Sequence, residues 1–403
     1  MKYRKMGSLG WEVSALGFGA MRFPVDKNHQ IKEDEAIQMI RYAIDHGLNY
    51  IDTAYPYHGG RSEVIVGKAL LDGYRKKVHL TTKLPIWLVR RQKNFERYFN
   101  RQLERLQTNP DIYLFHGLNK QRFKTLQDLN LIESMENARE NGLFKHIGFS
   151  FHDNYDTFKE IIDFYDWDCC QIQLNYLDID YQAGLKGLNY AGKKGIAVII
   201  MEPLRGGKLA ISNDDLETKP LIQEVLKNPN VHRSLPDWAL QFLWNQKYVS
   251  VVLSGMSSMQ QVVENVESAT NSGINILTKS ELDTITELRE VINKYVIVPC
   301  TRCGYCTPCP NGVSIPSVLG ILNEVAHWDA NPLFGYNQLA KTPEELERRR
   351  SAGEDVGGAA TLCTQCEECL EKCPQQIEIP NMMEKANLIF RDGKDIKEVL
   401  ELE

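Results

Sequence analysis

Eight of the ten cysteines are gathered in two short runs near the end of the chain. Two residues separate neighbouring cysteines throughout the first run, and the second run differs only in a last gap of three residues. The runs are Cys300, Cys303, Cys306 and Cys309, and Cys363, Cys366, Cys369 and Cys373, each followed by proline. Three thiolates at this spacing can surround one iron–sulfur cubane, while the fourth, before proline, binds a second cluster.

This pattern predicts two 4Fe-4S clusters with exchanged fourth ligands. We assign Cys300, Cys303, Cys306 and Cys373 to one cluster, and Cys309, Cys363, Cys366 and Cys369 to the other. The alternative is a pair of structural zinc sites, which usually separate their CxxC pairs by a longer loop. The segment resembles the two-cluster ferredoxins. The 53 residues between the two runs favour the α-helical variety.

A second group of polar residues follows buried apolar runs in the first part of the chain. Asp52, Lys83 and His116 each end such a run, and Tyr57 follows the first of them. A buried carboxylate or ammonium needs a partner, so we expect Asp52 and Lys83 to pair. This set suits carbonyl reduction: a hydride reaches carbon, and a phenol whose pKa is lowered by an ammonium gives oxygen a proton. His116 would orient the substrate oxygen.

The elements that must position these residues alternate between β-rich runs and helical stretches over residues 1–298. Eight consecutive βα units favour a closed (β/α)8 TIM barrel over a doubly wound sheet, which is the alternative for this alternation. The predicted strands are Ala15–Gly19, Leu48–Ala54, Val78–Lys83, Asp111–His116, His146–Ser150, Cys169–Leu174, Gly195–Met201 and Val249–Ser254. The predicted helices include Glu33–His46, Ser62–Leu71, Arg90–Leu106, Leu131–Asn141, Ala183–Lys194 and Ser234–Gln246.

Three further segments complete the predicted organisation. Lys2–Met6 and Trp11–Ser14 form an N-terminal β-hairpin that could plug the bottom of the barrel. The long loop that begins at Arg205-Gly206-Gly207-Lys208 lies on the catalytic face and could cover a ligand. Residues 299–403 form a separate, mostly α-helical ferredoxin-like domain with helices at Ile315–Trp328, Glu344–Arg350 and Asn381–Phe390.

The barrel resembles the aldo-keto reductases. In order and context, Asp52, Tyr57, Lys83 and His116 match the catalytic tetrad of that family, and the match includes Leu16-Gly17-Phe18-Gly19 and the closing Gly255-x-Ser257-Ser258 pattern. The resemblance implies an oxidoreductase that interconverts a small carbonyl compound and an alcohol with NADP(H) or NAD(H). It also implies cofactor contacts from Gly19, Met21, Asp52, Ser150, Gln171, Met201, Pro203, Leu204, Gly255, Ser257, Gln261, Glu264 and Asn265.

Within this resemblance, the cofactor choice stays open. Ser150 and Gln171 would bind the nicotinamide carboxamide, with Met201 where many relatives stack an aromatic ring. Some relatives bind the 2′-phosphate of NADP through Lys and Arg at the positions of Gly255 and Gln261, and their absence favours NAD. The closing pattern also resembles the β subunits of potassium channels, which bind NADP.

Composition limits the partners. A net charge of −6 argues against nucleic-acid binding, and no apolar run reaches the length of a membrane span. The first residues do not resemble a signal peptide, so we expect a cytoplasmic protein with reduced thiols.

The two halves differ in their electron chemistry. A nicotinamide transfers two electrons as one hydride, whereas a 4Fe-4S cluster passes one electron at a time. A relay through the clusters would therefore need a flavin or an electron-transfer partner protein. The alternatives are a reductase whose clusters are structural or redox-sensing, and a non-catalytic redox-sensing subunit.

Overall fold

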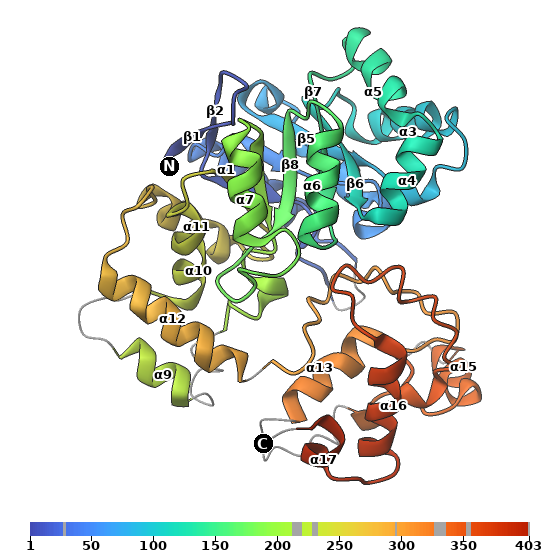
Figure 1. The fold of residues 1–403 in the computed structure, drawn as a ribbon. Helices are drawn as coiled ribbons and strands as arrows, with labels where there is room; N and C mark the ends of the chain where they lie inside the picture. Colours follow the sequence, from blue (N-terminus) through green and yellow to red (C-terminus); the bar gives the residue numbers. More distant parts are fainter. Residues whose placement is uncertain are drawn as a thin grey trace. The chain divides into compact units, whose positions relative to one another are not determined.

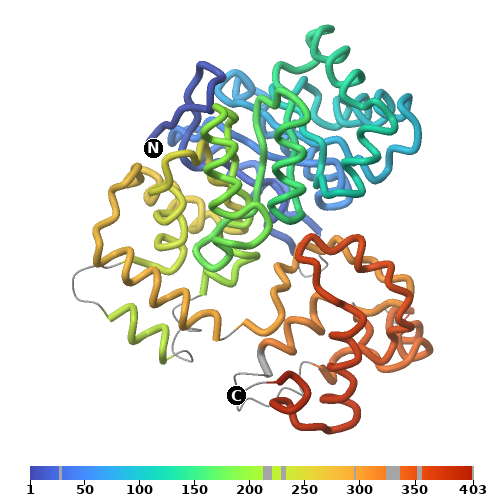
Figure 2. The backbone as a smooth tube through the Cα atoms, viewed as in Figure 1, coloured from blue at the N-terminus to red at the C-terminus, as the bar shows by residue number. Residues whose placement is uncertain are grey.

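The computed structural model describes residues 1–26, 30–211, 220–227, 233–294, 296–325, 336–351 and 356–401. The chain divides into two compact units. Figures 1 and 2 colour the chain by residue number, so the segments of each unit can be found from the bar. The first unit comprises residues 1–205, 209–211 and 230–285, and the second comprises residues 206–208, 212–229 and 286–403. The division falls within helix α12 (Lys279–Asn293), so the domain boundary after residue 298 stays a prediction.

Eight parallel strands of the first unit close into a barrel (Figure 1). In order of their hydrogen-bonded neighbours they are β10 (Val249–Ser254), β3 (Leu16–Gly19), β4 (Tyr50–Asp52), β5 (His79–Leu84), β6 (Ile112–Leu118), β7 (His146–Phe151), β8 (Cys169–Gln173) and β9 (Ala197–Met201). Each strand overlaps one of the eight predicted runs. The closed barrel confirms the predicted TIM fold and excludes a doubly wound sheet, which is open at two edges.

The strands of this barrel are buried on both faces. Every residue of β6 and β10 is buried, as expected for a parallel sheet that is lined by side chains inside and covered by helices outside. The helices of this unit are α1 (Glu33–Asp45), α2 (Arg61–Ala69), α3 (Asn94–Leu106), α4 (Lys120–Asp128), α5 (Leu131–Glu140), α6 (Tyr155–Phe164), α7 (Gly184–Lys193), α10 (Leu235–Trp244) and α11 (Met259–Thr270). Gly47 and Gly195 follow α1 and α7 with φ angles of 93° and 81°, which end these helices as predicted.

One predicted helix begins later than expected. The apolar pattern predicts a helix from Arg90, but α3 begins at Asn94. The Asn94 side chain accepts hydrogen bonds from the backbone N–H groups of Arg90 and Arg91, each at 3.1 Å. This side chain holds the preceding residues in a turn, because asparagine competes with helix hydrogen bonding at such positions.

The N-terminal hairpin closes the amino ends of the barrel strands. Strand β1 (Tyr3–Lys5) pairs antiparallel with β2 (Glu12–Ser14), as predicted. Met6 and Val13 are fully buried and belong to one hydrophobic cluster with residues from the amino ends of the barrel strands, such as Ile112. Arg4 donates hydrogen bonds to the carbonyl groups of Trp244, Gln246 and Val249 at 2.6–2.7 Å. The hairpin therefore plugs the barrel, as the sequence suggested.

The second unit is mainly helical where the structure describes it. Its helices are α9 (Pro220–Leu226), α13 (Ile315–Val325), α15 (Pro343–Ser351), α16 (Ile379–Phe390) and α17 (Ile396–Leu400), with part of α12. Residues of α13 and α16, including Leu319, Leu322 and Met383, form one buried core. The predicted helix over 315–328 is seen to residue 325, and residues 326–335 lie outside the described part.

Short 3-10 turns connect the longer elements: η1 (Tyr57–Gly60), η2 (Tyr74–Lys77), η3 (Ile86–Leu88), η4 (Arg205–Gly207) and η5 (Ala360–Leu362). Three of them, η1, η3 and η4, follow the carboxyl ends of barrel strands β4, β5 and β9. Among the described helices, none combines the length and apolar character that crossing a membrane requires.

Candidate active site and thiol cavities

A buried ion pair lies at the centre of the barrel site. Lys83 Nζ lies 2.6 Å from Asp52 Oδ1, and both side chains are at most 3% exposed. Lys83 Nζ also donates to the Thr53 carbonyl oxygen at 2.9 Å and to the Tyr57 hydroxyl at 3.3 Å. The His116 ring meets the Tyr57 ring edge to face, with 5.8 Å between their centroids. The structure thus brings together all four residues of the predicted tetrad.

Strand register explains this convergence. Asp52 is the last residue of β4 and pairs with Thr81, so Lys83 lies two residues further toward the carboxyl end of β5. His116 lies two residues beyond Leu114, the register partner of Lys83 on β6. The turn η1 begins at Tyr57 and continues through His58 with a φ of 50°. Residues two apart share one face of a strand. Lys83 therefore lies on the same face of β5 as Thr81, the partner of Asp52, and His116 lies on the same face of β6 as Leu114, the partner of Lys83.

Burial determines the electrostatics of the tetrad. It raises the pKa of Asp52 and lowers the pKa of Lys83, while the attraction between the two groups opposes both shifts. Burial also lowers the pKa of His116 well below its usual value, and the charges of Lys83 and Arg122 lower it further. The His116 imidazole is therefore neutral near pH 7 and can donate a hydrogen bond without carrying charge.

Aromatic and cationic groups surround His116. The Trp87 ring lies 5.0 Å from the His116 ring, and the Arg122 guanidinium lies 5.1 Å from the centre of the Trp87 ring. Two other histidines, His152 and His58, have polar contacts of their own. His152 Nδ1 lies 3.3 Å from Gln182 Oε1, and His58 Nε2 accepts from the Phe23 N–H at 3.3 Å.

The two residues predicted to hold a carboxamide lie side by side. Ser150 on β7 and Gln171 on β8 are register partners. Gln171 Nε2 donates to Asp52 Oδ2 at 3.4 Å, whereas Gln171 Oε1 is buried with no hydrogen-bond partner among the described residues. Ser150 Oγ accepts from the Gly117 N–H at 2.7 Å, which leaves its proton free to donate. A carboxamide offers the donor and the acceptor that this pair lacks, so these residues fit a nicotinamide.

A group of the predicted cofactor contacts, Gly255, Ser257, Gln261, Glu264 and Asn265, lies where β10 leads into α11. The Ser257 N–H and hydroxyl donate to Gln261 Oε1 at 2.8 and 3.2 Å. Asn265 Nδ2 donates to Ser254 Oγ at 3.0 Å, and Glu264 accepts from Gln260 at 2.8 Å. Gly255 precedes these residues, and Gly19 lies beside it on the neighbouring strand β3, where a Cβ atom would meet the Ser254 carbonyl oxygen at 3.3 Å. Met21 is half-buried just beyond Gly19.

The segment after β9 contains a residue that the sequence analysis did not assign. Met201 ends the strand as the register partner of Gln173, and Pro203 and Leu204 follow it. Arg205 is only 7% exposed, has a φ of 47°, and pairs through Nη2 with Asp178 Oδ1 at 3.1 Å. Its Nε and Nη1 atoms are buried without a hydrogen-bond partner among the described residues. The Arg205-Gly206-Gly207 sequence was the available signal, but only for a loop near a ligand.

A buried polar network holds the partner of Arg205 in place. Asp178 Oδ2 accepts hydrogen bonds from Gln173 Nε2 at 3.0 Å and Asn175 Nδ2 at 2.9 Å. Asn175 Oδ1 in turn accepts from the Asp178 N–H at 3.0 Å. Unsatisfied guanidinium donors are costly when buried, so a group with acceptor oxygens is the complement that these N–H groups lack.

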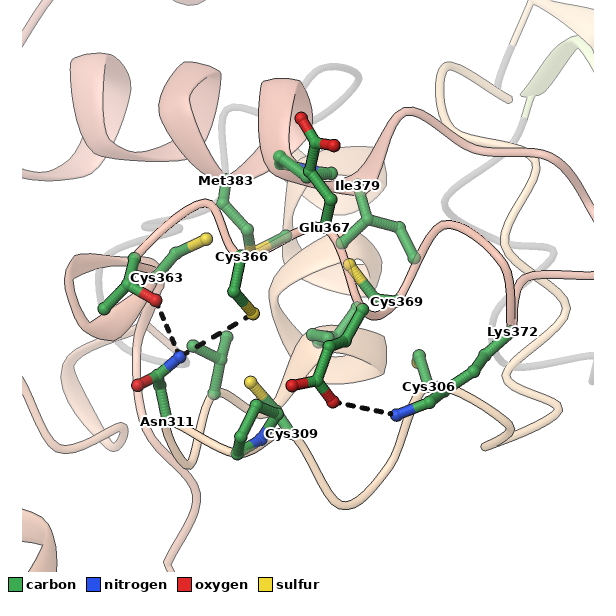
Figure 3. Close-up of a pocket in the computed structure, with 16 residues that line it drawn as sticks. Cys306, Cys309, Asn311, Cys363, Cys366, Glu367, Cys369, Lys372, Ile379 and Met383 are labelled. Atoms are coloured by element: carbon green, nitrogen blue, oxygen red, sulfur yellow. Dashed lines mark hydrogen bonds and ion pairs between the residues drawn. The ribbon is translucent and has the colours of Figure 1, made fainter.

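Two cavities of the second unit are lined by thiols. One is lined by Cys309, Cys363, Cys366 and Cys369, and Cys306 also reaches its wall (Figure 3). The other is lined by Cys300, Cys303, Cys306 and Cys373. The two groups are those that the sequence assigned to the two clusters, with Cys309 and Cys373 exchanged between the runs. Their thiol donors fit iron–sulfur clusters, which are held by four thiolates.

The thiols line these cavities with room between them. No three His, Cys, Asp or Glu side chains in the described ranges lie close enough together to hold a single metal ion. Burial raises the pKa of Cys306 to about 12 and of Cys369 to about 11, so these thiols are protonated in the absence of iron. Ligation by thiolates must therefore release protons. The other two cysteines, Cys169 and Cys170, are fully buried on β8, as expected for small core residues.

The fold and the two sites define a class of protein, an oxidoreductase barrel joined to an iron–sulfur domain. A sequence profile of the Aldo/keto reductase family matches residues 15–290. A profile of a 4Fe-4S dicluster domain matches residues 299–378. The chain belongs to the aldo/keto reductase family and carries a 4Fe-4S dicluster domain.

Related proteins match the barrel. L-galactose dehydrogenase from Arabidopsis thaliana is 29% identical over 309 residues, which are 71% of this chain and 95% of that protein. The uncharacterized oxidoreductase YqkF from Bacillus subtilis (strain 168) is 26% identical over 298 residues, which are 67% of this chain and 91% of that protein. The holo form of aldo-keto reductase AKR11C1 from Bacillus halodurans is 27% identical, with a TM-score of 0.59, over 72% of this chain and 96% of its own.

Proposed function

We propose that the protein uses NAD(P)(H) to interconvert a small carbonyl compound and an alcohol, and that two 4Fe-4S clusters relay electrons for it. The observation that carries this proposal is the position of Lys83 Nζ, which hydrogen-bonds both Asp52 and the Tyr57 hydroxyl in a buried site. A lone buried ion pair would need no phenol beside it. A phenol next to an ammonium is suited to give a proton to a developing alkoxide.

In this mechanism, each side chain of the tetrad has one task. Tyr57 donates its hydroxyl proton to the carbonyl oxygen and becomes a phenolate. The Lys83 ammonium stabilises that phenolate, and Asp52 holds the ammonium in place. The neutral His116 donates a hydrogen bond that orients the substrate oxygen. When bound, a reduced nicotinamide supplies the hydride that reaches the carbonyl carbon. Together, the hydride and the proton convert the carbonyl to an alcohol, and the reverse steps oxidise the alcohol.

Ser150, Gln171 and the β10–α11 segment are the residues that we assign to the nucleotide. The unpartnered Gln171 Oε1 supports a carboxamide contact. Gly255 and Gln261 offer no cation to a 2′-phosphate, which supports NAD(H), whereas the resemblance to channel β subunits supports NADP(H). We therefore assign these residues to a nicotinamide nucleotide. Binding measurements with NAD(H) and NADP(H) will decide between the two.

The clusters extend this chemistry to one-electron partners. Cys300, Cys303, Cys306 and Cys373 would hold one cluster, and Cys309, Cys363, Cys366 and Cys369 the other. A hydride carries two electrons, so exchange with the clusters requires a flavin or a partner protein that divides the pair. A cytoplasmic location, where thiols stay reduced, suits these ligands. We place the domain boundary between residues 298 and 299.

The test is an anaerobic purification followed by iron, sulfide and nucleotide analysis. We expect two clusters per chain, binding of NADH or NADPH, and oxidation of that nucleotide by members of a panel of aldehydes and ketones. NAD(P)H should also reduce the clusters when a flavin is added, which is measured as loss of their visible absorbance. A sample that binds neither nucleotide would contradict the reductase proposal. Clusters that stay oxidised with NAD(P)H and flavin would contradict the relay.

A further inference from the structure

We propose that Asn311 is a positioning residue that raises the reduction potential of the cluster held by Cys309, Cys363, Cys366 and Cys369. This inference rests on the cluster assignment of the proposed function. Asn311 Nδ2 lies 3.9 Å from Cys366 Sγ and 2.8 Å from Thr364 Oγ1. Figure 3 marks the contact between Asn311 and Cys366 with a dashed line. The amide thus reaches from the first cysteine run to a thiol of the second.

The chemistry of both groups determines which end of the amide faces the sulfur. A thiolate that binds iron can only accept hydrogen bonds, and the NH2 group of asparagine has two hydrogens to donate. One hydrogen can therefore serve Thr364 Oγ1 while the other serves Cys366 Sγ. The threonine contact fixes the rotation of the amide, so the second hydrogen is aimed rather than free to turn.

The backbone around Asn311 is fixed by the fold of this unit. The Gly312 N–H donates to the Cys309 carbonyl oxygen at 2.9 Å, and the Gly358 N–H donates to the Gly312 carbonyl oxygen at 3.0 Å. Val313 is 3% exposed and forms a β-bridge with Gly358. Asn311 therefore stands on a tied segment, which keeps its side chain beside the cavity.

A donor at this position favours the reduced cluster. Reduction adds one negative charge to the cluster and its thiolates, and a hydrogen bond to sulfur stabilises that added charge. Nearby carboxylates act in the opposite direction: Glu367 and Glu368 also line this cavity, and Lys372 pairs with Glu368 at 3.4 Å. In the other cavity, the Arg302 N–H donates to Cys300 Sγ at 3.5 Å, and no side-chain substitution can remove that backbone donor.

The test is a redox titration of the full, anaerobically prepared protein, followed by electron paramagnetic resonance. The variants are Asn311→Leu, which has the same shape and no donor, and Thr364→Val, which keeps the donor and removes its anchor. We expect Asn311→Leu to lower the midpoint potential of one cluster so that its reduced-to-oxidised ratio falls about tenfold, which is about 59 mV for one electron. The other cluster should keep its potential. Thr364→Val should lower the same potential less, and the double variant should equal Asn311→Leu.

Asn381→Leu, the same substitution at an exposed site of this unit, is the matched control and should change neither potential. Equal potentials in wild type and in Asn311→Leu would overturn the role of Asn311 alone. If Asn311→Leu loses a cluster, Thr364→Val decides: an unchanged potential in that variant would overturn the role. A wild-type protein without two reducible clusters would overturn the proposed function together with this inference.

Discussion

Single side chains decide the chemistry at the barrel site, because Lys83 connects a carboxylate and a phenol. Its ammonium contacts Asp52 Oδ1 at 2.6 Å and the Tyr57 hydroxyl at 3.3 Å. A buried ion pair of this kind contributes little to stability compared with a packed apolar pair. The proposed function in proton transfer would account for the cost of burying it.

We expect Tyr57→Phe to lower kcat for carbonyl reduction by about 10²- to 10⁴-fold, the usual contribution of a positioned acid. The substitution removes the proton donor and leaves the Lys83–Asp52 pair intact, so the nucleotide dissociation constant should stay within about twofold. Steady-state kinetics and a binding titration measure both quantities. Tyr55→Phe, two residues away, is the control and should keep full activity. A Tyr57→Phe enzyme with wild-type kcat would contradict the assignment.

Buried histidines predict acid sensitivity. Burial lowers the pKa of His152 to about 4, whereas an unfolded histidine titrates near 6.5. Between pH 6.5 and about 4, the unfolded chain therefore binds more protons than the folded chain. The contribution of His152 to the free energy of unfolding is complete above pH 6.5 and decreases as the pH falls to about 4. We expect His152→Gln to remove up to about 1.4 kcal/mol per pH unit from this slope. Above pH 7, His152→Gln and wild type should have the same slope.

At the scale of elements, strand ends and the turns after them assemble the site. The register of β4, β5 and β6 places Asp52, Lys83 and His116 at the same end of the barrel. The segment after β9 adds Arg205, whose Nε and Nη1 atoms have no partner among the described residues. Its φ of 47° is a strained backbone conformation for arginine, as is common at ligand sites.

We expect Arg205 to bind the anionic part of the dinucleotide. A hydrogen bond to a charged group contributes about 1.5–3 kcal/mol, so Arg205→Met should weaken nucleotide binding by about 10- to 150-fold. A fluorescence titration with NADH and NADPH measures the change. Arg139→Met on α5 is the control and should bind as wild type does. Unchanged affinity in Arg205→Met would show that the guanidinium serves the fold alone.

The hairpin plug makes a separate prediction about stability. Met6 is fully buried within the barrel cluster, so Met6→Ala should lower the free energy of unfolding by about 2–5 kcal/mol. Its neighbour Lys5 is exposed, and Lys5→Ala should change stability by less than about 0.5 kcal/mol. Chemical denaturation of the barrel, followed by circular dichroism, compares the two. Equal stability of both variants would mean that the hairpin does not contribute to the barrel core.

At the scale of the whole molecule, one chain combines an aldo/keto reductase barrel with a 4Fe-4S dicluster domain. The tetrad lies in the first unit, and the cluster thiols lie in the second. The proposed carbonyl chemistry uses residues of the first unit alone, whereas the proposed relay requires both units. This separation makes the relay testable by a substitution that spares the tetrad.

We expect Cys300→Ser to lose about half of the iron and sulfide, since one of two clusters loses a ligand. Carbonyl reduction per folded molecule should stay unchanged, because no residue of the tetrad is altered. Reduction of a one-electron acceptor dye by NAD(P)H, with flavin added to every sample, should fall to the level of a protein-free control. A variant that reduces the dye as fast as wild type would favour structural or redox-sensing clusters.

The sequence by itself determined the barrel, the tetrad and the two groups of thiols. Strands buried on both faces read as continuous apolar runs, and cluster ligands lie at fixed spacings, so local patterns carried this information. The predicted start of α3 was wrong. The Asn94 side chain accepts hydrogen bonds from the Arg90 and Arg91 N–H groups, and this interaction outweighed the apolar pattern.

Only the tertiary structure decided which distant polar groups meet. Arg205 pairs with Asp178 and keeps two guanidinium nitrogens without a partner among the described residues, and Asn311 contacts Cys366. The sequence around these residues does not indicate which residue each of them meets. Hydrogen bonds of this kind depend on strand register and loop path, which are set by packing across the whole unit. Residue spacing along a chain encodes local geometry, whereas the approach of two side chains from different segments exists only once the core has formed.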